Sequence, residues 1–282
     1  MRIENTVPHP DRNAALRVQY DHRTHLLKAI HLITSLFRQM LFSIGYGYHR
    51  AISKKQPSTL WNTESQGLVV LLHGLRSDPA AWFPQLSLLR KHQKIDVFNP
   101  LVHKRGLCAL EEATLPLLPR VIDYIQTHPG RPICLIGMSN GSRIATWLET
   151  RLREIAPQTP VMVSTISGVH LGSSRMNQLE KFKMKSALYP AALQQELKFQ
   201  SEYALNLLNR VRAPLPPNCA PRKFEFYATT DDLLIPDLAS SLPEINQGER
   251  FYVLQGHSHD SIVSAVAEQQ IDSCLSWILQ RI

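Results

Sequence analysis

The sequence predicts an α/β fold, with a mostly parallel sheet of about six strands and helices on both faces. From Gly67 onward, short apolar runs alternate with amphipathic stretches, which is the pattern of strands joined by helices. The 282 residues suffice for one large core. Apolar residues make up 44% and charged residues 19% of the chain. This composition is ordinary for a globular protein and excludes a disordered or fibrous chain.

Six apolar runs are expected to form the strands, at residues 68–72, 95–98, 133–136, 161–166, 224–228 and 251–254. Helices are expected between and after them, at residues 79–92, 109–128, 142–155 and 261–282. The second of these contains Pro116 and Pro119. The regular alternation places residues 67–282 in one domain.

A long segment at residues 172–222 interrupts the alternation. It contains helical stretches around 176–188 and 191–211 and ends in a proline-rich run. An insertion at such a place commonly forms a cap or lid over a site. The alternative interpretation is two packed helices with no gating role.

Residues 1–66 are expected to form a basic N-terminal arm. Residues 1–60 carry nine Lys or Arg against three Asp or Glu, a difference of six in a formal net charge of +8. Apolar residues recur there at the spacing of an amphipathic helix: Leu26, Ile30, Ile33, Phe37, Met40 and Ile44. We favour packing of this apolar face on the core of the domain. The alternative is an interfacial membrane helix within residues 22–45.

Residues 57–66 are then a linker. The simplest interpretation of the excess charge is that these basic side chains lie on a solvated surface. No nucleic-acid partner is expected, because no supporting motif is present. The first residues lack the apolar core of a signal peptide, and no uncharged apolar run of about 18 residues occurs. We expect a cytoplasmic or peripheral membrane protein. Export by a route that needs no signal peptide remains an alternative. The four cysteines contain no C-x-x-C pair and predict no metal site.

The most informative segment is the G-x-S-x-G at residues 137–141, directly after a predicted strand and before a helical pattern. In this context Ser139 is expected on a strained strand-to-helix turn that exposes its hydroxyl. Gly137 and Gly141 remove side chains that would collide in so tight a bend. The amides at the start of the helix would face a developing negative charge. Ser139 is therefore the candidate nucleophile.

A serine that attacks a carbonyl needs two backbone N–H groups to stabilise the oxyanion. Asn140, directly after Ser139, is expected to supply one, and Leu75, in the loop after the first strand, the other. Gly74 would let that loop turn closely beneath the substrate. His73 is expected to order the loop, because the base of such a site comes later in the chain.

The serine also needs a histidine to take its proton and a carboxylate to orient that histidine. Asp231 and Asp232 follow the fifth predicted strand, and Asp232 is favoured because Leu-Leu-Ile-Pro comes after it. His257 and His259 follow the sixth. His259 is favoured because it directly precedes the closing helix and has an apolar residue three positions later. Asp231 and His257 remain open as alternatives.

Together these motifs resemble the α/β-hydrolase superfamily, and within it the lipase and esterase branch. The resemblance covers residues 67–282 and rests on residues 73–75, 137–141, 232–236 and 256–263. Residues 164–173 are also similar to the loop that leads into the lid of triacylglycerol-lipase-like proteins, although valine replaces the usual proline before His170. Residues 200–209 resemble the helix that follows that lid.

The resemblance implies an α/β-hydrolase fold that cleaves carboxylic esters through an acyl-serine intermediate, with no metal and no cofactor. The expected substrate is a small-molecule ester, most of all a lipid ester. An acyltransferase or thioesterase would use the same three residues. A non-catalytic binding protein on a hydrolase fold is the alternative from another class, and the intact Ser, Asp and His positions argue against it.

Overall fold

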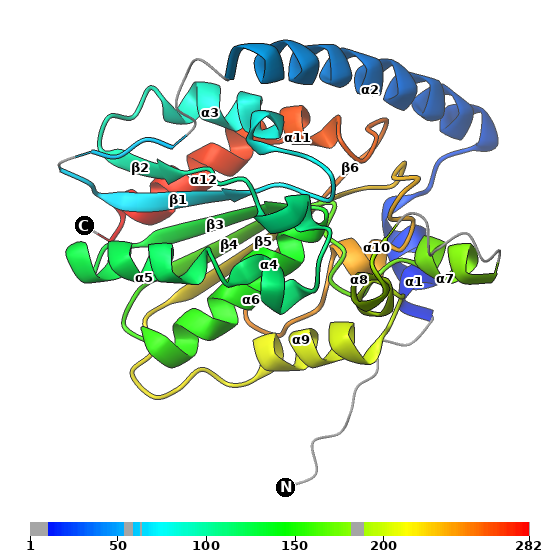
Figure 1. The fold of residues 1–282 in the computed structure, drawn as a ribbon. Coiled ribbons are helices and arrows are strands. Elements are labelled where there is room, and N and C mark those ends of the chain that lie inside the picture. The colour runs from blue at the N-terminus through cyan, green and yellow to red at the C-terminus, as the bar shows by residue number, and fades with distance from the viewer. Residues whose placement is uncertain (1–10, 54–58, 63, 182–188, 282) are drawn as a thin grey trace, which may run out of the picture.

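The computed structural model has a six-stranded parallel sheet with helices on both faces, as predicted (Figure 1). It describes residues 11–53, 59–62, 64–181 and 189–281. The strand order is β2-β1-β3-β4-β5-β6, and each neighbouring pair of strands is parallel. The strands are β1 (Gly67–Leu72), β2 (Ile95–Phe98), β3 (Ile133–Met138), β4 (Val161–Ile166), β5 (Arg222–Thr229) and β6 (Arg250–Leu254). Every run predicted as a strand is one.

Helices bury both faces of the sheet, and for this reason β1, β3 and β4 are buried along their whole length. Two apolar clusters lie on the two sides of the sheet. One side is covered by α4 (Leu110–Thr114), α5 (Leu118–Thr127), α6 (Asn140–Ile155) and α9 (Glu202–Arg212). The other is covered by α3 (Phe83–Leu89), α11 (Ile262–Ala265) and α12 (Ala267–Leu279).

Four helices predicted as continuous are broken, including the stretch at 191–211, which divides into α8 (Ala191–Glu196) and α9. Residues 79–92 begin as a 3₁₀ turn, η1 (Pro79–Trp82), before α3. Residues 109–128 divide into α4 and α5 on either side of Pro116, which lacks the N–H that a continuous helix needs. The closing helix divides into α11 and α12 at Val266. Two short elements were not predicted: η2 (His103–Gly106) and α10 (Leu238–Ser241).

The insertion contains α7 (Ser174–Lys181), α8 (Ala191–Glu196) and α9, and residues 182–188 of the first predicted helix lie outside the described residues. Met176, Leu193 and Leu197 from this segment form a small apolar cluster with Val169 and Ile235, and Leu75 packs against it. The insertion therefore contacts the loop that follows β1.

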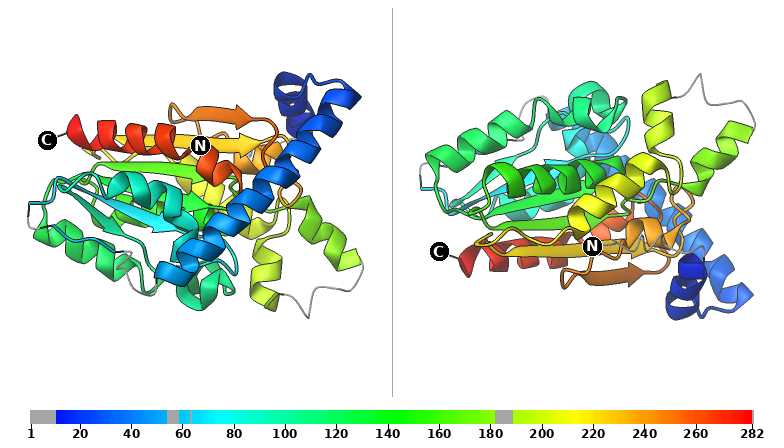
Figure 2. Two further views of the ribbon diagram at one scale, coloured as in Figure 1. Left: turned by 90° about the horizontal axis from the view of Figure 1, so that it is seen from above. Right: turned by 90° about the horizontal axis from the view of Figure 1, so that it is seen from below.

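The N-terminal arm forms α1 (Asp11–Tyr20), which was not predicted, and α2 (His25–Ser53). Seen from above, α2 runs diagonally across the molecule near the carboxyl ends of the strands (Figure 2). The favoured prediction, that its apolar side packs on the core, is wrong. Ile33 and Ile44 are 68% and 62% exposed, whereas Ser35 and Arg38 on the opposite side face the protein.

The reason is that α3, α11 and α12 already cover this face of the sheet. Phe42 of α2 joins the apolar cluster of this face, and α2 also contacts polar groups, namely the carbonyl of Gly256 and the carboxylates of Asp78 and Asp260. No helix in the described part of the chain is long and apolar enough to cross a bilayer. The predicted linker lies partly outside the described residues, and within it Leu60 forms an antiparallel bridge to Val97.

Candidate functional site

Ser139 lies at the turn from β3 into α6, with φ 54° and ψ −124°. This conformation is unfavourable for a residue with a Cβ atom. The turn is fixed from both sides, because the Ser139 amide donates to the Ile166 carbonyl at 2.9 Å and the Ser139 carbonyl accepts from Ser142 at 3.0 Å. The side chain is partly exposed, and its hydroxyl makes no hydrogen bond with the described residues. The backbone thus holds this serine strained and accessible.

Close backbone contacts explain the glycines around Ser139. A Cβ atom on Gly141 would lie 1.9 Å from the carbonyl oxygen of Leu72, and one on Gly137 would collide with Gly141. A Cβ atom on Gly74 would lie 2.9 Å from the Cβ and 3.4 Å from the Oγ of Ser139. The loop after β1 therefore passes directly beside the serine.

His73 is fully buried and ties that loop down. Its Nε2 accepts a hydrogen bond from the Val102 amide at 3.0 Å, and its Nδ1 lies 2.9 Å from the Gly74 carbonyl, to which it donates. Burial lowers the pKa of His73, which keeps the ring neutral. Both ring nitrogens are used within the loop.

His259 and Asp232 form a buried pair after β6 and β5. The His259 Nδ1 lies 2.7 Å from the Asp232 Oδ2, and the two residues are 6% and 5% exposed. The Asp232 Oδ1 accepts from the amides of Leu234 and Ile235, each at 2.8 Å. This arrangement holds the proton of His259 on Nδ1 and leaves Nε2 as a proton acceptor.

Burial lowers the pKa of His259, but the carboxylate of Asp232 outweighs this and sets the pKa above the ordinary value of 6.5. Ser139, Asp232 and His259 all follow strands of one parallel sheet, so they lie at the same edge of it. Among the described contacts, no hydrogen bond joins the Ser139 hydroxyl to His259. Such bonds are often long in ligand-free sites and tighten in the substrate complex.

Asp231 and His257, the alternative candidates, contact the N-terminal arm. Asp231 forms an ion pair with Arg23 at 2.8 Å, and His257 Nε2 lies 2.9 Å from the Arg38 guanidinium. Burial, together with the charge of Arg38, lowers the pKa of His257 to about 4. No motif indicated these two arginines as partners, because more than two hundred residues separate the members of each pair.

Asn140 is held by a buried polar chain that the sequence analysis missed. Its Oδ1 accepts from Arg143 at 3.1 Å, and Arg143 forms an ion pair with Glu196 of α8 at 2.9 Å. Glu196 also accepts from the Leu110 amide at 3.0 Å. The insertion is thereby joined to the first turn of α6, directly after Ser139.

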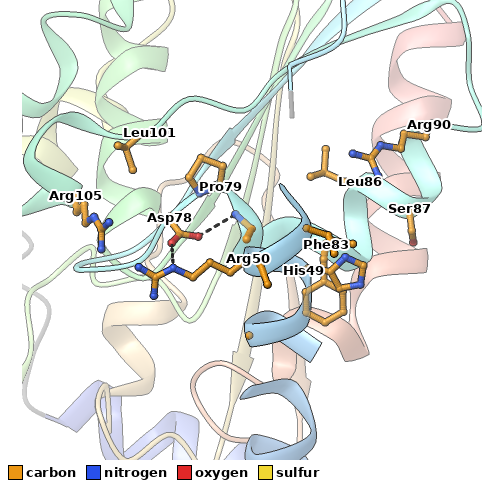
Figure 3. Close-up of a pocket in the computed structure, with 14 residues that line it drawn as sticks. His49, Arg50, Asp78, Pro79, Phe83, Leu86, Ser87, Arg90, Leu101 and Arg105 are labelled. Carbon is orange, nitrogen blue, oxygen red and sulfur yellow. Dashed lines mark hydrogen bonds and ion pairs between the residues drawn. The ribbon is translucent and has the colours of Figure 1, made fainter. Parts of the chain in front are cut away.

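A cavity of about 800 Å³ opens between the C-terminal end of α2 and η1–α3 (Figure 3). Arg50 forms an ion pair with Asp78 at 2.9 Å across it, and His49 stacks on Phe83 with the ring centroids 4.6 Å apart. Ser139 is not among its lining residues. Within the described residues, no group of three or more His, Cys, Asp or Glu could hold a metal ion.

Two solved structures resemble this one over most of its length. One, from work on LipS and LipT, two metagenome-derived lipolytic enzymes, has a TM-score of 0.52 at 14% identity and covers 79% of this chain and 97% of that chain. The other comes from work on carboxylesterases of the ammonia-oxidizing thaumarchaeon Nitrososphaera gargenis. It has a TM-score of 0.51 at 15% identity, and the match covers 79% of this chain and 94% of that chain. No family model and no curated protein sequence matches the chain.

The class that these observations define is an α/β protein with a parallel sheet and a serine on its central strand-to-helix turn. The chain has the α/β-hydrolase fold.

Proposed function

We propose that this chain is a serine hydrolase that cleaves carboxylic esters, with Ser139 as nucleophile, His259 as base and Asp232 as the acid that orients the base. One observation carries the proposal: an accessible serine in a strained turn lies at the same sheet edge as a buried His–Asp pair. Strain of this kind persists where the surrounding structure enforces it, and it is common at reactive groups.

In the proposed reaction, His259 takes the Ser139 proton while the serine oxygen attacks the acyl carbon of the ester. The bond from the acyl carbon to the alcohol oxygen then breaks, and His259 returns the proton to the leaving alcohol. Water, deprotonated by the same histidine, attacks the acyl-serine. The products are the carboxylic acid and the free serine.

We assign the oxyanion hole to the amides of Leu75 and Asn140, each worth about 3 kcal/mol in such sites. The contact between Gly74 and Ser139 supports this assignment, because it places the following amide close to the serine. Asn140 is the first residue of α6, where a helix leaves its amides without an internal acceptor. His73, Gly137 and Gly141 then act by shaping the two loops.

We further propose lipid esters as the substrate class and a membrane-surface association through residues 22–45. The apolar cluster beside Leu75 supports the first part, since it places apolar side chains next to the proposed oxyanion hole. The exposed apolar side of α2 supports the second. The likeness to a structure from work on lipolytic enzymes is consistent with the first part.

The function is tested with a fluorophosphonate, which labels activated serines, and with p-nitrophenyl esters of graded acyl length. We expect one label per chain, on the peptide that contains Ser139, and faster hydrolysis of longer acyl chains than of acetate. A label on another residue, or no label, would contradict the serine mechanism. Labelling of Ser139 with acetate as the best substrate would keep the mechanism and reject the lipid preference.

We expect kcat/KM for a p-nitrophenyl ester to rise with pH and then level off. His259 serves as a base only when neutral, and its pKa lies above the ordinary 6.5, so activity falls as pH drops through that value. The measurement is a kcat/KM profile from about pH 5 to pH 9. A profile that is flat, or that falls as pH rises towards neutrality, would be inconsistent with His259 as the base.

A further inference from the structure

The outward side of α2 carries a continuous apolar strip, here called the outer strip. Each of its side chains is at least 48% exposed; they are Leu26, Ile30, Ile33, Leu36, Phe37, Met40, Leu41 and Ile44. The helix has 29 residues, or roughly 43 Å at 1.5 Å per residue. Exposed apolar surface gathered along one helix is unusual in a monomeric soluble protein and indicates an interaction site.

The inner side of α2 fixes this orientation through polar contacts. Arg38 donates to the Gly256 carbonyl at 2.8 Å, and Gln39 donates to Asp260 at 2.9 Å. At the other end, Arg50 pairs with Asp78. The outer strip could turn towards the core only if these contacts broke. The same contacts hold the turn that carries His259 and the loop that follows β1.

The charge around the strip favours an anionic partner. Residues 22–63 contain six Lys or Arg and no Asp or Glu, and three of these cations, Arg23, Lys28 and Arg50, form ion pairs with aspartates outside this range. Arg90 and Arg105 add two cations at the rim of the cavity beside the C-terminal end of α2. Anionic lipid headgroups would supply negative charge for Arg90 and Arg105, which lie beside the end of the strip.

We infer that the outer strip of α2 docks on an anionic lipid surface, with the helix lying in the plane of that surface. An amphipathic helix bound in this way places its apolar side chains about 5–10 Å into the boundary between headgroups and acyl chains. This inference specifies the membrane-surface association proposed above. It rests on the proposed hydrolase function only in that the Ser139 site would take its ester from the same lipid surface. Because α2 holds both loops beside Ser139, docking would place the site next to its substrate.

The test is co-sedimentation of the full chain with phosphatidylcholine vesicles, with or without phosphatidylglycerol. The variant carries Ile33→Asp and Phe37→Asp, which put two charges into the outer strip. Leu115→Asp is the matched control, because Leu115 is 69% exposed between α4 and α5, away from α2. We expect the unchanged chain and the control to bind the anionic vesicles, and the double variant to bind at least about tenfold more weakly.

Equal binding of the double variant and the control would overturn the inference, as would equal binding to neutral and anionic vesicles. Light scattering without vesicles gives a third readout. A dimer that the double variant dissociates would show that a second copy covers the strip, which also overturns the inference. Binding is measured without turnover. Loss of the proposed hydrolase activity would therefore leave this result standing, and loss of binding would leave hydrolysis of a soluble acetate ester unchanged.

Discussion

Replacing Ser139 by alanine is expected to lower kcat for ester hydrolysis by about 10⁴- to 10⁶-fold, the loss typical when the nucleophile of such a site is removed. The expected change in the free energy of unfolding is less than about 0.5 kcal/mol, because the hydroxyl makes no hydrogen bond with the described residues. The measurement combines steady-state hydrolysis of a p-nitrophenyl ester with urea unfolding of both proteins.

Ser167→Ala provides the matched control. Ser167 follows the neighbouring strand β4, also has a positive φ of 45°, and has a buried hydroxyl with no hydrogen-bond partner among the described residues. Alanine at this position has a Cβ atom as serine does, so the strain of the positive φ is unchanged. The substitution removes only a hydroxyl without a hydrogen-bond partner among the described residues. We expect kcat to stay within about twofold of the unchanged chain. Equal activity of the Ser139 and Ser167 variants would reject the proposed mechanism.

The sheet could be predicted from the sequence because its strands lie between two layers of helices. Because β1 and β3 are buried on both faces, they are nearly continuous apolar runs. Such runs can be identified as strands without knowing which strands lie beside them. The breaks within helices were harder to see. Pro116 stood inside the predicted helix at 109–128, but amphipathic spacing continues across it, and the pattern alone did not show where the chain would bend.

Local motifs also indicated Ser139, Asp232 and His259 as candidates, because each lies shortly after a predicted strand in a segment with its own sequence signature. Contacts between residues that are far apart in the sequence have no such local signature. The ion pair of Arg143 with Glu196, for example, joins positions 53 residues apart. Only the fold brings these groups together, so a pattern read along the chain could not reveal them.

The orientation of α2 shows another limit of sequence patterns. Periodicity defines an apolar side of a helix but does not say what that side contacts. The prediction of core packing assumed that the domain would offer an apolar surface to the arm. The structure offers polar groups of the Gly256–Asp260 region to Arg38 and Gln39 instead, and the apolar side faces outward.

Replacing His259 by alanine is expected to lower kcat/KM by about 10⁴-fold or more, whereas His257→Ala should cost no more than about threefold. Asp232 Oδ2 holds the Nδ1 proton of His259, which leaves Nε2 to accept the serine proton. His257 has its Nε2 against the Arg38 guanidinium, and burial with that charge lowers its pKa to about 4. A ring so weakly basic would be a poor acceptor near neutral pH.

The measurement compares kcat/KM of both variants with the unchanged chain on one soluble ester, with circular dichroism to show that each is folded. Asp232→Asn is a useful third variant, because it keeps the shape of the side chain but no longer stabilises the imidazolium, and about a 10⁴-fold loss is expected. Equal mild losses in the two histidine variants would show that neither ring is the base. A large loss confined to His257→Ala would transfer the role to the ring beside the arm, and docking of α2 would then act on the base directly through Arg38.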